Sequence, residues 1–217
     1  MITILAGLLA VTNVSNRNWE QWDHGHVAEV IDSYWLGSQN EIAHREVLAA
    51  LVKRWMMPGE RLLEIGCGSG LVYNQLVPHM LPNHAYVGID ISAAMLKIAC
   101  KRFPEGNFFK DDLYALSFPN NSFEIATAFE VFGHINGIEK PIAEMFRVAS
   151  RLAIFTIWRG PKTKVEQECI ESSVFIRTTF SEEDVLKAID NALNCQSYTV
   201  YIQPLSNDKT AFIIQKQ

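Results

Sequence analysis

The chain has 217 residues, a net charge of −5, 48% apolar residues and 20% charged residues. This balance predicts one globular domain with its own core and at most a small appendage. The acidic net charge and the lack of a basic run argue against a nucleic-acid or anionic-membrane partner. The four cysteines form no CxxC pair, which is typical of reduced thiols. We therefore expect a cytoplasmic protein, monomer or homodimer.

The first forty residues differ in composition from the rest of the chain. Residues 1–11 are apolar, too short to span a bilayer and not preceded by a basic residue. We expect them to pack on the domain or on a second subunit, with an export signal as the alternative. Residues 12–40 combine polar side chains with three of the five tryptophans. We expect residues 1–40 to form a cap or lid over a domain at 41–217.

From residue 41 onward, hydrophobic periodicity predicts helices that alternate with strands. Helices are expected at 41–57, 70–80, 92–99, 137–149, 165–175 and 182–194. Strands are expected at 61–65, 85–90, 107–110, 123–129, 152–158, 198–203 and 210–215. This order predicts an α/β fold, a doubly wound, Rossmann-like, seven-stranded sheet that is mostly parallel and ends in a C-terminal antiparallel hairpin.

The stretch Arg61–Gly70 is predicted to be a buried strand that runs into a tight turn. Three alternate glycines at Gly66–Gly70 allow the backbone to turn sharply and to approach a ligand. Glu64 stands just before the turn, where a carboxylate would repel a pyrophosphate but suits an ammonium group. A dinucleotide fingerprint would also need glycine in place of Leu71. The pattern therefore favours S-adenosylmethionine over a dinucleotide.

Further polar residues follow the next strands of the predicted sheet. Asp90 ends the second strand, about 20 residues past the glycine turn, where a carboxylate can accept hydrogen bonds from a ribose diol. Asp112 follows the third strand and can accept from an exocyclic amine. Phe129 and His134 follow the fourth strand. Each feature alone is weak, since a strand-end aspartate is often only a helix cap. Features at four successive strand ends seldom coincide by chance.

The segments Glu64–Gly70, Val87–Ser92 and Asp112–Glu124 together resemble the class I S-adenosylmethionine-dependent methyltransferases. The likeness is greatest to the small-molecule branch with a Methyltransf_11-like core. It covers residues 45–158 well and the C-terminal hairpin by topology only. It implies S-adenosylmethionine as cofactor, with S-adenosylhomocysteine as product, and it does not specify the acceptor.

The resemblance implies a part for each residue at the cofactor. Glu64 would hold the methionine ammonium, Asp90 the ribose diol and Asp112 the adenine amine. Further implied contacts are the turn residues Gly66, Cys67 and Gly68, the adenine-packing residues Ile91 and Met95, Leu113 at the adenine ring, and Phe129 through its carbonyl.

Methyl transfer from a sulfonium requires exclusion of water and, for an O–H or N–H nucleophile, removal of a proton. The aromatic segment before residue 40 is the candidate cover, although its rings could instead serve only to pack a helix. Its candidate lid and substrate residues are Trp19, Trp22, Tyr34 and Trp35.

His134 is the first candidate for the general base, because imidazole titrates near neutral pH. A structural histidine is the alternative reading, and Tyr34 is a second candidate. Arg159 could contact an anionic substrate or could be a solvated loop residue.

The sequence also disfavours several activities. No Asn/Asp-Pro-Pro-Tyr/Phe motif follows the fourth strand, which argues against nucleobase methylation, and no metal-ligand spacing is present. We expect methyl transfer to an O or N nucleophile of a small molecule, with carbon as a further option. Two alternatives stay open. One is a non-catalytic S-adenosylmethionine-binding regulatory or partner subunit, and the other is an aminopropyl-type transferase.

Overall fold

The computed structural model describes residues 18–24, 26–170, 173–205 and 208–217. The expectation for residues 1–11 therefore lies outside the described residues. The helices are η1 (Asn18–Asp23), α1 (Val27–Gly37), α2 (Gln39–Trp55), α3 (Leu71–Leu76), η2 (Asn83–Ala85), α4 (Ala93–Arg102), η3 (Phe132–His134), α5 (Glu139–Val148) and α6 (Glu182–Ala192). The strands are β1 (Leu62–Ile65), β2 (Tyr86–Asp90), β3 (Phe108–Lys110), β4 (Phe123–Ala128), β5 (Ala149–Arg159), β6 (Lys164–Ile170), β7 (Ser173–Phe180), β8 (Tyr198–Pro204) and β9 (Lys209–Lys216).

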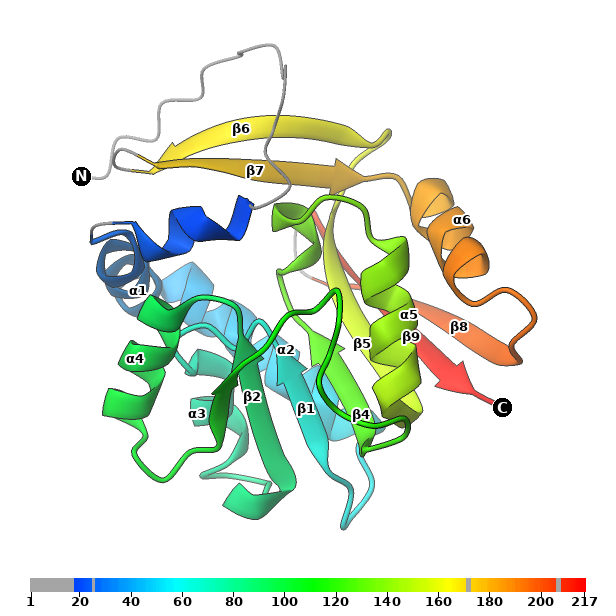
Figure 1. The fold of residues 1–217 in the computed structure, drawn as a ribbon, viewed down its shortest axis with the longest axis horizontal. Helices are drawn as coiled ribbons and strands as arrows, with labels where there is room; N and C mark the ends of the chain where they lie inside the picture. Colours follow the sequence, from blue (N-terminus) through cyan, green and yellow to red (C-terminus); the bar gives the residue numbers. More distant parts are fainter. Residues whose placement is uncertain (1–17, 25, 171–172, 206–207) are drawn as a thin grey trace.

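One sheet runs through the molecule (Figure 1), in the order β3-β2-β1-β4-β5-β7-β6, with β9 paired to β5 and β8. Strands β3 to β5 are parallel neighbours, and Leu63 of β1 pairs with Val87 on one side and Ala126 on the other. Strands β8 and β9 are antiparallel. The mostly parallel α/β sheet with antiparallel C-terminal strands is confirmed. Because the central strands are parallel, the carboxyl ends of β1, β2 and β4 meet at one edge.

Helices cover both faces of this sheet, and the strand residues alternate between them. Leu63 and Ile65 pack in the cluster that includes α5 and α6. Leu62 faces the opposite cluster, which includes α2, α3 and α4. Figure 1 shows α5 and α6 together, apart from α2 and α3. Leu63 is fully buried, and truncation of such a side chain typically costs about 2–5 kcal/mol of stability.

The helix expected at 165–175 is wrong. This stretch belongs to an antiparallel hairpin of β6 and β7, in which Val165 pairs with Thr178. Strand β7 also continues the sheet, because Thr179 pairs in parallel with Trp158 at the end of β5. Glutamates and a glutamine made residues 165–170 resemble a helix, but pairing with the β-branched strand β7, which follows directly in the sequence, overrides local propensity. The sheet in the described part of the chain consequently has nine strands rather than seven.

The cap, defined here as η1 and α1, lies between α4 and the β6–β7 hairpin (Figure 1). Val27 and Ile31 of α1 pack in one cluster with Met95 of α4 and Phe175 of β7. The cap is therefore part of the packed structure over the carboxyl edge of the sheet. In the described ranges, no helix has both the length and the apolar character needed to cross a membrane.

Candidate active site

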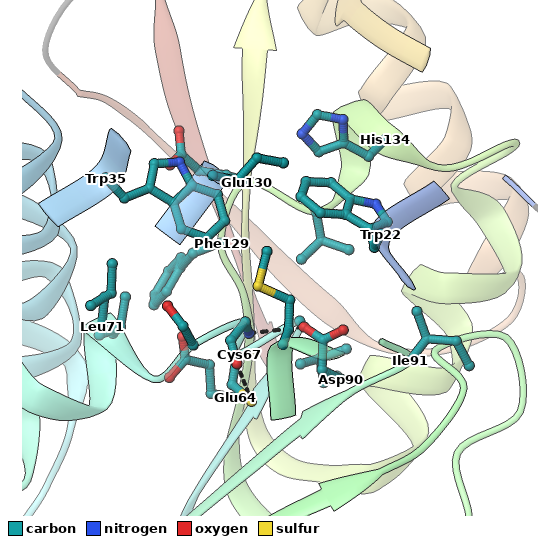
Figure 2. A pocket seen from close by; sticks show the side chains of 18 of the residues that line it. Trp22, Trp35, Glu64, Cys67, Leu71, Asp90, Ile91, Phe129, Glu130 and His134 are labelled. Atoms are coloured by element: carbon teal, nitrogen blue, oxygen red, sulfur yellow. Dashed lines mark hydrogen bonds between the residues drawn. The ribbon is translucent and has the colours of Figure 1, made fainter. Parts of the chain in front are cut away.

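A cavity of about 590 Å³ lies at the carboxyl edge of the sheet. Its floor comes from the ends of β1, β2 and β4, and its roof from the cap and the β6–β7 hairpin. Figure 2 shows Glu64, Cys67 and Asp90 at one end and Trp22 with His134 at the other. The cavity thus has the position that ligands occupy in open α/β sheets.

The glycine turn forms one wall of the cavity. Gly66 adopts a φ of +70°, and a Cβ there would lie 2.3 Å from Cγ2 of Val131, so only glycine fits. The backbone N–H groups of Gly66 and Cys67 both donate to the Ile89 carbonyl, at 2.8 and 2.9 Å. These bonds fix the turn against the end of β2. The neighbouring Gly68 has a φ of +54° and also lines the cavity.

Asp90 sits at the end of β2 and also borders the cavity. Its two oxygens accept hydrogen bonds from the backbone N–H groups of Gly68 and Ser92, both at 2.8 Å. Burial raises the pKa of Asp90, and these bonds partly oppose the rise. Each carboxylate oxygen can accept a second hydrogen bond. The side chain is thus fixed in place and can still accept from a pair of ligand hydroxyl groups.

Glu64 is only 2% exposed, yet it lines the cavity. Burial raises its pKa to about 8, although a hydrogen bond from the Tyr86 hydroxyl and the positive charge of Arg45 oppose the rise. A buried acid of this kind gains most from a ligand cation, because an ammonium group would favour its ionised form. The residues of the glycine turn and Glu64 therefore fit the methionine end of S-adenosylmethionine.

The remaining predicted cofactor residues also line the same cavity. Oδ1 of Asp112 accepts from the backbone N–H of Tyr114 at 2.8 Å, which fixes the start of the turn after β3. Asp112 itself is exposed, whereas the adjacent Leu113 is buried. The structure brings together all ten residues that the sequence assigned to the cofactor, namely Glu64, Gly66, Cys67, Gly68, Asp90, Ile91, Met95, Asp112, Leu113 and Phe129.

The four aromatic residues of the cap also line the cavity: Trp19, Trp22, Tyr34 and Trp35. Trp22 packs edge-on against Phe175 of the hairpin, with ring centroids 4.8 Å apart, and against His134 at 5.3 Å. The rings therefore pack the cap and line the cavity at once. Tyr34 is 45% exposed, which places it at the rim.

His134 ends η3, the short helix that follows β4. Its Nδ1 lies 2.9 Å from the Ile176 carbonyl of β7. Since a carbonyl can only accept, Nδ1 carries the proton in the neutral ring and Nε2 keeps its lone pair. Burial lowers the pKa of His134, although the bond to Ile176 and nearby carboxylates oppose this. The ring is therefore neutral at pH 7 and able to accept a proton.

Arg159 lies outside the cavity that these residues share. Its guanidinium is 3.8 Å from Glu182, and its side chain is 42% exposed. The structure thus places Arg159, the last residue of β5, at the surface. Within the described ranges, no group of three His, Cys, Asp or Glu residues could hold a metal ion.

Sequence reasoning missed Arg45 of α2. Its Nη1 donates to the backbone oxygen and to Oε2 of Glu41, at 2.7 and 2.9 Å, and its guanidinium lies 5.2 Å from the Trp35 ring. Only 8% of the residue is exposed, so a full charge stands among the apolar positions of an amphipathic helix. A charged residue at a buried helix position is the signal that could have identified it.

Sequence reasoning also missed a charged cluster formed by Glu130, Lys209 and His44. Glu130 has a φ of +59°, forms an ion pair with Lys209 and lies 3.4 Å from Nε2 of His44. Burial would raise the pKa of Glu130, but the nearby His44 and the charge of Lys209 lower it to about 2. Glu130 and Lys209 line the cavity. Glu130 follows β4 and Lys209 begins β9, two segments that the sequence alone does not bring together.

Comparison with known proteins agrees with this geometry. Residues 62–151 match the family described as a methyltransferase domain. A demethylmenaquinone methyltransferase from Renibacterium salmoninarum is 34% identical over 92 residues, which is 42% of this chain and 38% of that protein. A dTDP-3-amino-3,6-dideoxy-alpha-D-glucopyranose N,N-dimethyltransferase from Streptomyces fradiae is 30% identical over 131 residues, 59% of this chain and 49% of that protein. The matches span less than half the length of these two relatives.

The crystal structure of DesVI from Streptomyces venezuelae superimposes with a TM-score of 0.68. It covers 88% of this chain and 98% of the DesVI chain at 16% identity, which is a likeness of fold. The matched residues include the glycine turn and both strand-end aspartates that face the cavity. Residues 62–151 thus match a methyltransferase domain, and the chain has the fold of S-adenosylmethionine-dependent methyltransferases.

Proposed function

We propose that this chain transfers a methyl group from S-adenosylmethionine to an oxygen or nitrogen of a small molecule, with carbon as a further acceptor type. One observation carries the proposal. The same cavity holds Glu64 and Asp90 at one end and His134 at the other, and Asp112 also lines it. A cofactor site alone would not need a neutral histidine fixed in one tautomer.

The chain's residues would hold the cofactor along the carboxyl edge of the sheet. Glu64 would accept from the methionine ammonium, and Asp90 and Asp112 from the ribose and the adenine amine. Burial raises the pKa of Glu64, and the positive charge of Arg45 opposes this rise. Arg45 donates its hydrogen bonds only through Nη1. We propose that its other donors bind the methionine carboxylate. When bound, S-adenosylmethionine supplies an electrophilic methyl group on its sulfonium.

His134 would serve as general base for an O–H or N–H acceptor. The acceptor oxygen or nitrogen would receive the methyl group that the bound cofactor supplies, with its proton directed at His134. Nε2 of His134 takes the acceptor proton, while Nδ1 stays bonded to Ile176. Burial favours the neutral ring, so the base is ready at neutral pH.

The cap would exclude water from the reacting groups. Trp22 lies against both His134 and Phe175. The ring centroids of Trp35 and Trp22 are 6.5 Å apart. Aromatic faces can also stabilise a cationic sulfonium. The two relatives are each named for a small-molecule reaction, which supports a small acceptor. We propose residues 1–40, which include the cap, as a separate lid segment and residues 41–217 as the methyltransferase domain.

Calorimetry with S-adenosylmethionine tests the cofactor assignment. Replacing Asp90 by alanine should weaken binding by about 1–3 kcal/mol, because the ribose hydroxyls lose their acceptor. Asp190→Ala is the control, since Asp190 is exposed on α6 and bonds Tyr198. Equal affinity in wild type and Asp90→Ala contradicts the ribose assignment.

Methyl-labelled S-adenosylmethionine in a small-molecule extract tests turnover. We expect label in a non-protein product with the wild-type chain. Tight cofactor binding without transfer to any extract component would instead favour a non-catalytic subunit. Transfer of the aminopropyl group of the decarboxylated cofactor would favour the other alternative.

A further inference from the structure

The β6–β7 hairpin brings a guanidinium close to the proposed base. Arg177 follows Ile176, whose carbonyl holds Nδ1 of His134. Cζ of Arg177 lies 4.9 Å from the ring centroid of Trp158, and the ring centroid of His134 also lies 4.9 Å from it. The guanidinium and the imidazole are therefore at most about 10 Å apart on one tryptophan. We call the part of the cavity bordered by these three side chains the acceptor region.

Arg177 keeps its hydrogen-bond donors available. Three arginines and lysines line the cavity among the described residues, and two of them, Arg45 and Lys209, are in close ion pairs with Glu41 and Glu130. The carboxylate nearest to Arg177 is Glu168, with Oε1 4.0 Å from Nη1. This separation exceeds hydrogen-bond distance. In the described part of the chain the guanidinium donates no hydrogen bond, although it has five donors.

The surroundings of Arg177 suit a planar anion. One face of the Arg177 guanidinium lies against the Trp158 ring. The edge of the guanidinium, which carries its N–H groups, can therefore contact a ligand. That edge matches two oxygens of a carboxylate or phosphate. The Glu168 side chain, which is 20% exposed, attracts the guanidinium from one side but accepts no hydrogen bond from it. Trp22 and Trp158 add aromatic walls.

We propose that the acceptor carries an acidic group, a carboxylate or a phosphate, which Arg177 binds while the nucleophile faces His134. This inference rests on the proposed function, because it concerns the acceptor of the same reaction. Arg177 is then a specificity-determining residue, and β7 sets the distance between acid and nucleophile. The opposite class, an acceptor with an ammonium group bound by Glu168, is the outcome that would overturn it.

Binding to the protein saturated with S-adenosylhomocysteine tests the proposal without the true acceptor. The probes are benzoate and phenyl phosphate, with benzamide as neutral and benzylamine as cationic comparison, followed by tryptophan fluorescence and calorimetry. We expect at least one anion to bind at least tenfold more tightly than benzamide. Arg177→Gln should abolish this preference, and Arg177→Lys should restore part of it.

Arg159→Gln is the matched control, because Arg159 is as exposed as Arg177, has a similarly loose ion pair and lies outside the cavity. It should leave the preference unchanged. Equal binding of both anions and benzamide overturns the proposal, as does equal loss in Arg177→Gln and Arg159→Gln. Tightest binding of benzylamine, lost in Glu168→Gln, overturns it in favour of a cationic acceptor. Failure to bind S-adenosylhomocysteine would count against the proposed function instead.

Discussion

The carboxylate of Asp23 in the cap accepts hydrogen bonds from Oγ of Ser92 at 2.6 Å and from the backbone N–H of Ala94 at 3.0 Å. The N–H of Ser92 donates to Asp90 at 2.8 Å. The cap and the proposed ribose-binding carboxylate therefore meet at the first turn of α4. Burial opposes ionisation of Asp23, but the bonds from Ser92 and from the helix N-terminus lower its pKa.

Asp23→Ala should loosen the cap and weaken cofactor binding together. Loss of a helix-capping carboxylate typically costs about 1 kcal/mol of stability, and the detached cap would no longer place Trp19 and Trp22 over the cavity. Thermal unfolding and calorimetry with S-adenosylmethionine measure the two effects. His24→Ala is the control, because His24 is exposed and does not line the cavity. Unchanged cofactor affinity in Asp23→Ala would show that this contact does not govern binding.

Cofactor binding should strengthen as the pH rises toward about 8. Below its raised pKa of about 8, Glu64 holds a proton, and it must lose that proton to pair with an ammonium group. Binding at neutral pH should therefore release a proton, which calorimetry in two buffers of different ionisation enthalpy detects. Glu64→Gln, which cannot ionise, should bind more weakly and show no such release. Wild-type proton release equal to that of the variant would contradict pairing through Glu64.

The same carboxyl group should affect the stability of the ligand-free protein. Its folded pKa of about 8 lies above the ordinary value of 4.5, so between these values the folded state holds a proton that the unfolded state has lost. The Glu64 contribution to the free energy of unfolding should therefore fall as the pH rises from about 4.5 to about 8. Denaturant unfolding at several pH values measures it. The difference between wild type and Glu64→Gln should follow this slope.

The cofactor end of the site could be predicted from sequence because its residues follow strands in a regular order. Glu64 and Asp90 are each at a fixed place relative to a glycine turn or a strand end, so local pattern and topology determine their position together. Ser92 and Ser181 stand at the starts of two predicted helices and cap them, since each accepts from a backbone N–H in the first turn, at 3.1 Å.

The acceptor region could not be predicted because it forms only when separate strands pair in the sheet. Arg177 reaches the cavity only because β7 pairs with β5, in a stretch whose β6 half reads as a helix by local propensity. Lys209 and Glu130 are 79 residues apart in sequence. No periodicity within either segment indicates that such residues meet.

Arg102 should couple the cap to the glycine turn. Its guanidinium donates to both oxygens of Asp32 in α1, at 3.0 and 2.6 Å, and to the Ser69 carbonyl at 3.0 Å. The Asp32 side chain is 10% exposed, so removing Arg102 leaves a nearly buried carboxylate without its partner. We expect Arg102→Met to cost about 1–3 kcal/mol of stability.

A double-mutant cycle separates this pair from its surroundings. Denaturant unfolding of Arg102→Met, Asp32→Asn and the double variant should give a smaller loss in the double variant than the two single losses together. Arg61 with Glu124 is the control pair, since both side chains are more exposed and such pairs contribute about 0–1 kcal/mol. Additive losses at Arg102 and Asp32 would show that the pair does not act as a unit.

His134→Gln should lower turnover by about 10²–10⁴-fold and leave cofactor affinity nearly unchanged, because imidazole is proposed to take a proton rather than to bind the cofactor. The pKa of His134 is lowered from 6.5, so the wild-type rate should rise with pH below that value and level off above it. This rise of the rate on the acid side is measured by the transfer of labelled methyl groups into the small-molecule fraction of an extract, from about pH 5 to 9. His84→Gln is the control, since His84 is exposed in η2 and outside the cavity. The rise of the rate on the acid side should persist in His84→Gln and should be absent from the residual rate of His134→Gln. If it persists unchanged in both variants, another group accepts the proton.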